Sequence, residues 1–234
     1  MLSSQKLPFG TRSRALSAVM TALVVICITA ASPQAQGAPS ASHPDRMAAA
    51  SSQRTASLNA LYSAMQTLWA QHMEWTYAAV TAYVSNPPAF DATAARLLEN
   101  QVAIGSAIKP FYGDVAGDAL TKLLKEHIGA AVDVVKAAKA GDKTALDKAV
   151  AVAYANAQDI ADFLAKANPH WKQAEMRAML KGHIDTTIDY ATDLIQGKYA
   201  EGIAAYDKAE AHMLGMADEL SAGLIAAFPD KFRK

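Results

Sequence analysis

The sequence has a single cysteine, Cys27, among its 234 residues, and this cysteine lies near the N-terminus. Residues 1–37 have a basic start without acidic residues, an apolar stretch over 15–31 and small residues at 35–37, which is typical of a secretory signal peptide. The apolar stretch is shorter than the roughly 20 residues of a membrane helix. We therefore expect a cleaved signal peptide over 1–37. The mature chain is expected in the periplasm or outside the cell, without a thiol or a disulfide and without membrane contact.

The sequence also lacks an excess of charge of either sign, with 22 Lys and Arg against 22 Asp and Glu. Loss of residues 1–37 removes three basic residues, which leaves 19 Lys and Arg against 22 acidic residues and a net charge of −3. Nucleic-acid-binding domains usually carry a basic stripe. We therefore expect no nucleic acid as a partner.

Several motifs of catalytic sites are missing as well. The sequence has no Gly-x-Ser-x-Gly, no glycine-rich phosphate loop, no His-Glu-x-x-His and no Glu-x-x-His. These absences argue against a serine hydrolase, a nucleotide-binding loop, a zincin-type protease and a di-iron carboxylate bundle. The sequence supports no particular reaction, so we do not expect an enzyme, although an enzyme of unknown reaction stays open as an alternative.

Runs of alternating β-branched residues are absent too, whereas strong helix formers such as Ala, Leu, Lys and Met are abundant. After a flexible leader over 38–54, residues 55–234 are expected to form one all-α domain. Short breaks at prolines and glycines divide this domain into six helices, which predicts a bundle of three pseudo-repeated antiparallel hairpins. The expected helices cover residues 57–84, 91–112, 116–140, 143–168, 171–196 and 199–228, and the second of them has an alternative end before Lys109 and Pro110.

Two short strings alternate along this domain with an almost constant period, which indicates a repeat architecture. In the first string a histidine follows an apolar helical stretch, and its copies end 55 and 56 residues apart at His72, His127 and His183. In the second string the copies are 56 residues apart and begin at Asn100, Asn156 and His212. Steps of three and four residues place the histidines of the first string on the apolar stripe of their helices.

The spacing also predicts the depth of these residues in the bundle. Each lies about 14 residues, or roughly 20 Å, from the end of its helix. All six should therefore lie in one layer at mid-height, where they would form a polar belt inside an apolar bundle. The belt consists of His72, Asn100, His127, Asn156, His183 and His212.

Two interpretations of the belt remain open. In the first, it is a layer of buried hydrogen bonds that pairs His72 with Asn100 and His127 with Asn156, and the chain is a structural or interaction protein. In the second, the six residues line a site for a small polar ligand or a metal ion. The metal ligands would then be His72, His127, His183 and His212.

The residue types around the belt narrow the choice of metal. Imidazoles with methionine thioethers nearby suit copper or zinc better than magnesium or calcium. We therefore predict an exported helical binding protein that takes a transition metal ion or a small polar ligand at its belt. A structural protein with a self-satisfied polar layer is the alternative.

Four motifs resemble those of a group of exported bacterial all-helical proteins without an established activity. They read ENQVAIGSAIKPFYG at 99–113, LLKEHI at 123–128, NPHW at 168–171 and FPDKF at 228–232. The resemblance covers nearly all of the mature chain and implies a helical fold, but no mechanism. Some members of this group carry an automatic glycosyltransferase label. Glycosyltransferases look like α/β proteins with acidic metal-binding motifs, and nothing in this sequence supports that activity.

Overall fold

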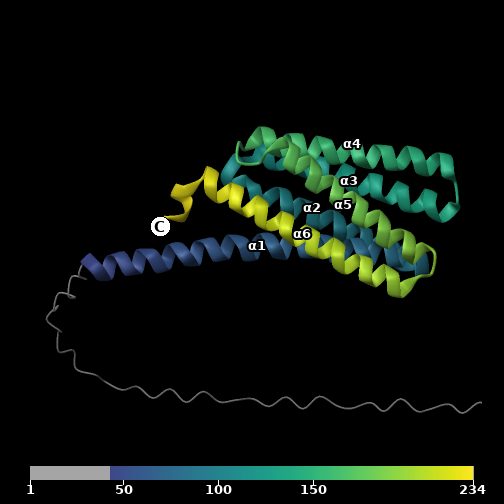
Figure 1. The fold of residues 1–234 in the computed structure, drawn as a ribbon, viewed down its shortest axis with the longest axis horizontal. Coiled ribbons are helices and arrows are strands. Elements are labelled where there is room, and N and C mark those ends of the chain that lie inside the picture. Colours follow the sequence, from purple (N-terminus) through teal and green to yellow (C-terminus); the bar gives the residue numbers. More distant parts are fainter. Residues whose placement is uncertain (1–42, 234) are drawn as a thin grey trace, which may run out of the picture. The chain divides into compact units, whose positions relative to one another are not determined.

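The computed structural model describes residues 43–233 and consists of six α-helices and two short 3-10 helices (Figure 1). No strand occurs among the described residues, so the predicted all-helical class is confirmed. The predicted signal peptide lies outside the described residues. The elements are α1 (His43–Ser85), η1 (Pro87–Ala89), α2 (Phe90–Tyr112), α3 (Asp114–Ala140), α4 (Lys143–Ala167), α5 (Gln173–Ile195), α6 (Tyr199–Ala227) and η2 (Pro229–Phe232).

Glycine and proline set the ends of most helices. Gly113, Gly141 and Gly197 follow or separate helices with φ angles of 83°, 69° and 74°, a region that side chains with a Cβ rarely adopt. Pro87 and Pro169 lie just after the ends of α1 and α4, where a missing N–H and a fixed φ prevent the helix from continuing. The predicted and observed ends of α2 to α6 differ by at most two residues when α2 is taken to end at Tyr112. The alternative end before Lys109 is wrong, because α2 continues through Pro110.

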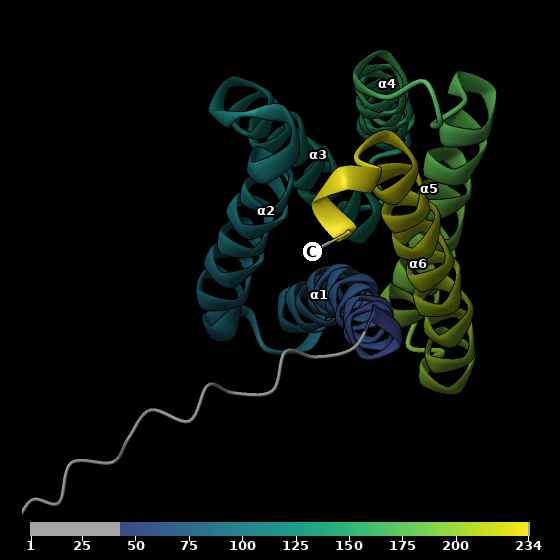
Figure 2. The same cartoon turned by 90° about the vertical axis from the view of Figure 1, so that its left-hand side faces the viewer.

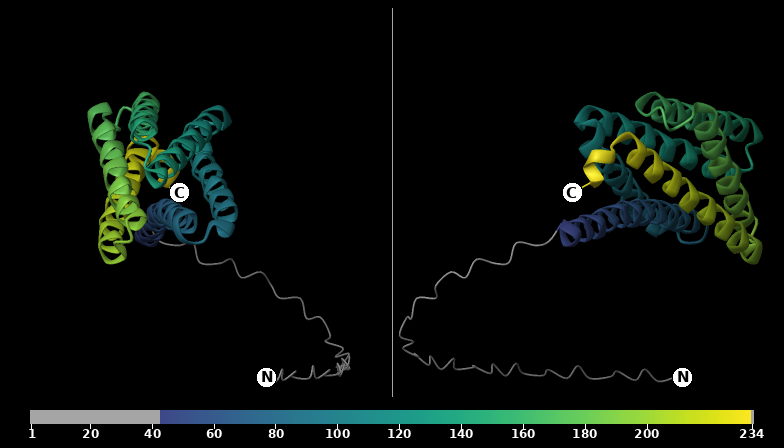
Figure 3. Two further views of the ribbon diagram at one scale, coloured as in Figure 1. Left: turned by 90° about the vertical axis from the view of Figure 1, so that its right-hand side faces the viewer. Right: turned by 60° about the vertical axis from the view of Figure 1, so that its left-hand side comes forward.

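The helices form a closed arrangement in which neighbours in the sequence are neighbours in space. Each helix packs against the next one along the chain, and α6 packs against α1 (Figure 2). Short connections make these neighbours antiparallel. Helix α5 also contacts α1 and α3, so the three odd-numbered helices meet inside the bundle, while α5 and α6 lie side by side in both views of Figure 3.

Helix α1 is longer than the sequence pattern predicts. It begins at His43 rather than at Ser57, and its N-terminal part extends beyond the other helices (Figure 1). Residues 51–56 are exposed, and from residue 51 onward the first buried residue of the helix is Met65. The helical part of the expected leader is rich in alanine, a strong helix former, but it has no apolar period. The periodic pattern therefore located the part of α1 that joins the core, and not the start of the helix.

Helices α2 and α3 approach each other closely at two glycines. A Cβ added to Gly105 would lie 1.9 Å from Thr121 Oγ1 and 2.6 Å from the backbone oxygen of Gly117. A Cβ on Gly117 would in turn lie 2.7 Å from the backbone oxygen of Gly105. The two backbones therefore leave no room for a side chain at this crossing.

Substitution of Gly105 by alanine should destabilise the protein by about 1–3 kcal/mol, since the backbone of α3 has to move. The matched control is Gly129→Ala in α3, where an added Cβ has no neighbour within 4 Å. This change should stabilise the protein by about 0.5–1 kcal/mol through helix propensity alone. Urea unfolding measures both effects, and equal stabilities of the two variants would contradict the close crossing.

Candidate metal centre

Three of the predicted belt histidines meet in the interior of the bundle. His72 in α1, His127 in α3 and His183 in α5 are 2%, 5% and 3% exposed. One ring nitrogen from each lies within 4.8 Å of the other two, and the ring centroids are 5.5–6.4 Å apart. The apolar stripes of α1, α3 and α5 bring these rings together, because each histidine lies on the stripe that packs inward. We call these three residues the histidine triad, and its geometry could hold a metal ion.

In each ring of the triad, Nδ1 has a polar neighbour. The neighbours are Gln101 Nε2 at 3.2 Å from His72, Asn156 Oδ1 at 3.0 Å from His127 and Thr187 Oγ1 at 3.5 Å from His183. The contact of His127 fixes its tautomer, because an amide oxygen only accepts hydrogen bonds. Nδ1 of His127 therefore carries the proton and donates it to Asn156, which leaves a lone pair on Nε2. In metal sites of proteins, a histidine ligand usually donates such a hydrogen bond from the ring nitrogen that does not bind the metal, and this bond orients the ring.

The polar groups next to His72 do not all have hydrogen-bond partners. Gln101 is fully buried, and its Nε2 lies within hydrogen-bonding distance of three acceptors, which are Leu97 O, Asn100 Oδ1 and Nδ1 of His72. Its two hydrogens can serve only two of them, and its Oε1 has no hydrogen-bond partner. This hydrogen bonding leaves the tautomer of His72 less firmly fixed than that of His127.

Burial keeps the triad uncharged at neutral pH. Burial, with a smaller effect of nearby His127, lowers the pKa of His72 to about 3. Burial also lowers the pKa of His127 against a weaker opposing effect of Asn156, and it lowers the pKa of His183 well below the usual value. The neutral imidazole is the form that binds metals. The rings are therefore ready to bind an ion without first losing a proton.

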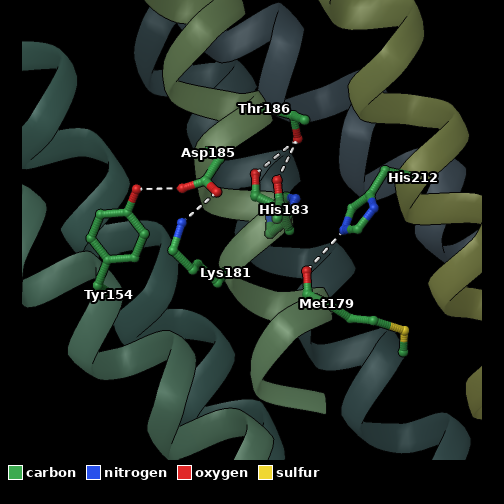
Figure 4. A network of polar contacts seen from close by, with 8 residues as sticks. Tyr154, Met179, Lys181, His183, Asp185, Thr186 and His212 are labelled. Carbon is green, nitrogen blue, oxygen red and sulfur yellow. Dashed lines mark hydrogen bonds and ion pairs between the residues drawn. The ribbon is translucent and has the colours of Figure 1, made fainter. Parts of the chain in front are cut away.

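Asp185, two residues after His183, is half-buried but does not face the triad. Its Oδ1 accepts a hydrogen bond from Tyr154 at 2.5 Å, and its Oδ2 pairs with Lys181 at 2.6 Å (Figure 4). Both oxygens are therefore occupied on the side of α4. Among the described residues no Asp, Glu, Lys or Arg is buried, so the triad has no buried charged partner.

The other three predicted residues contact the backbone next to the triad. Asn100 Nδ2 donates to Leu68 O at 3.0 Å, and Asn156 Nδ2 donates to Leu123 O at 3.1 Å. His212 is not part of the triad, because its Nε2 lies 2.8 Å from Met179 O (Figure 4). Each of these three carbonyls belongs to the residue four positions before a triad histidine. Side chains of the even-numbered helices thus bond to the backbone one turn before each triad histidine. None of them adds a fourth imidazole to the triad.

The predicted pairing of His72 with Asn100 is replaced by a contact between His72 and Gln101. The sequence contained a signal for this contact, because the other two pairs of positions, 127 with 156 and 183 with 212, are 29 residues apart. The same spacing from His72 falls on Gln101. Asn100 is one residue short of it and bonds to the backbone of α1 instead.

Apolar side chains surround the triad along the bundle. A cavity of about 60 Å³ begins one turn beyond the histidines, at Thr76 and Thr187, and its other lining residues include Ala79, Val80, Leu97 and Ile128. A smaller apolar cavity of about 20 Å³ lies between Trp69, Leu120 and Leu180, which precede the triad histidines by three to seven residues. The triad is therefore a polar layer in an otherwise apolar core.

No protein-family model matches the chain, and neither a curated protein nor a solved structure is similar enough to it to match. No helix of the described residues is long and apolar enough to cross a membrane. The chemistry of the triad is therefore the basis for assigning a function.

Proposed function

We propose that this chain is an exported protein that binds one transition metal ion, copper or zinc, at His72, His127 and His183. The observation that carries the proposal is the convergence of three buried, neutral imidazoles with ligand atoms within 4.8 Å of one another. Imidazole suits both copper and zinc, and three histidines are a known set of protein ligands for a metal ion. The predicted signal peptide supports a location in the periplasm or outside the cell.

The three hairpins are best explained as copies of one ancestral unit. The recurring strings support this, and so do the three hydrogen bonds that join Asn100, Asn156 and His212 to carbonyls in equivalent positions of the preceding helix. In such a repeat each hairpin contributes one histidine to the triad and one anchoring residue beside it. A binding site for a single ion then arises where the three copies meet.

Titration of metal-free protein with copper or zinc should raise its melting temperature by about 5–10 °C. Free metal at 100 times the dissociation constant stabilises the folded state by about 2.7 kcal/mol, and a domain of this size gains about 2–4 °C per kcal/mol. The protein has to be purified without a histidine tag, and elemental analysis should find one ion per chain. His183→Gln should abolish the shift, whereas His170→Gln, which changes an exposed histidine, should retain it. Absence of stoichiometric binding with both metals would contradict the proposal.

A structural polar layer is the second candidate function, and the contact of His127 with Asn156 favours it. This pair satisfies the Nδ1 of one and the Oδ1 of the other without any ligand. Buried polar contacts of this kind can fix the register of packed helices. No reaction is proposed, because among the described residues no buried carboxylate stands beside the triad to act as an acid or a base.

A further inference from the structure

The triad offers a bound ion no compensating charge. Its neighbours Gln101, Asn156 and Thr187 are neutral, and the described core contains no buried carboxylate. Asp185 is tied to Tyr154 and Lys181. An ion in the triad would therefore keep its whole charge inside the bundle.

The cost of burying an ion rises with the square of its charge. A dication that loses its water in such a site is penalised about four times as much as a monocation of similar size. The lone pairs of neutral imidazoles offset part of this desolvation penalty, but these ligands cannot neutralise the charge of the ion. The surroundings of the triad therefore discriminate against divalent ions.

The number of available ligands points in the same direction. Zinc in proteins takes four ligands, and with three histidines the fourth is usually a water molecule. A buried water needs two to four polar partners. The cavity next to the triad is lined mainly by apolar side chains, and the hydroxyl of Thr76 already donates to His72 O at 2.6 Å. Copper(I), a soft monocation, is satisfied by three neutral ligands and needs no such water.

We propose that the histidine triad selects copper(I) over zinc(II), because the site supplies three neutral ligands and neither a negative charge nor a hydrated fourth position. This inference rests on the proposed metal-binding function. Copper(I) and zinc(II) both have a filled d shell, so neither ion has a geometric preference that arises from d electrons. A difference between their affinities therefore reports the effects of charge and coordination number.

The first experiment compares the affinities of the two ions. Untagged protein recovered after export is freed of metal and titrated without oxygen, with copper(I) against a coloured copper(I) chelator and with zinc(II) against a zinc indicator. We expect one copper(I) per chain and a dissociation constant for zinc(II) that is at least about 100 times larger. Zinc binding that is equal or tighter would overturn the selectivity and leave metal binding intact. Failure of both ions to bind would overturn the proposed function itself.

The second experiment adds the missing charge. Thr187 Oγ1 lies 3.5 Å from Nδ1 of His183, so Thr187→Asp places a carboxylate beside the triad, and Thr187→Asn is its neutral control of the same shape. Thr187→Asp should lower the ratio of the zinc(II) to the copper(I) dissociation constant at least about tenfold. Thr187→Asn should leave this ratio unchanged. Equal shifts in both variants would overturn the explanation by charge, and wild-type titration tests the selectivity even if Thr187→Asp does not fold.

Discussion

Acidification of the metal-free protein from pH 6.5 to pH 5 should lower its free energy of unfolding by up to about 5 kcal/mol. Burial lowers the pKa of His72 to about 3 and lowers the pKa values of His127 and His183 as well. In the unfolded chain the same rings take up protons near pH 6.5. Below that pH the unfolded state therefore binds more protons than the folded state. The stability that the neutral rings provide is complete above pH 6.5 and is lost as the pH falls toward the folded pKa values.

This loss is large compared with the total stability of about 5–15 kcal/mol of a typical domain. Urea unfolding at several pH values between 6.5 and 5 measures it, and this window lies above the range in which carboxylates take up protons. His127→Gln should reduce the loss by up to about one third, because one of three buried rings with a lowered pKa is removed. A wild-type stability that stays constant over the window would show that the rings are not buried in neutral form.

The sequence predicted most of the fold because most breaks between helices have a local chemical cause, although Pro110 lies inside α2 without ending it. Gly113, Gly141 and Gly197 adopt positive φ angles, and the prolines at 87 and 169 remove a backbone donor, so each break has a local cause. The start of α1 has no such signal. Residues 51–56 are exposed, and an amphipathic period cannot reveal a helical segment that has no buried face.

The convergence of His72, His127 and His183 was predictable for a similar reason. Each histidine shares a stripe with buried apolar residues of its helix, such as Trp69 and Leu124, so the stripe determines the direction of the ring. The pattern does not specify which metal ion the triad would hold. That choice depends on what surrounds the rings, and a repeated string of residues does not specify those surroundings.

The position of His212 shows the limit of the depth argument. Equal distances from the helix ends predict the height of a residue in the bundle, but not how far its ring reaches toward the axis. Helix α6 packs on α1 and α5, and the ring of His212 lies over Gly182, where an added Cβ would be 3.0 Å from Cε1 of His212. The missing side chain at Gly182 therefore lets His212 bond to the backbone of α5. Contacts of this kind depend on the crossing of two helices and are not visible in one sequence.

Double substitution of His127 and Asn156 by leucine should restore most of the stability of the metal-free protein that either single substitution removes. Asn156→Leu leaves the Nδ1–H of His127 buried without an acceptor, and His127→Leu leaves the Oδ1 of Asn156 without a donor. Each single change should therefore cost about 1–3 kcal/mol. Removal of both partners eliminates the unsatisfied groups, so the coupling energy from the double-mutant cycle should be close to the sum of the two single costs, about 2–6 kcal/mol.

The same variants separate the two candidate functions when they are titrated with metal. Asn156→Leu keeps all three imidazoles and loses the hydrogen bond that orients one of them, which should weaken metal binding about 10–100-fold. The double variant should be folded and stable but unable to bind metal with three histidines. If the layer is only structural, elemental analysis will find no metal in the wild type or in any variant, and stability alone will follow the cycle. If the layer is a metal site, affinity will fall from wild type through Asn156→Leu to the double variant, although the double variant is the more stable of the two without metal.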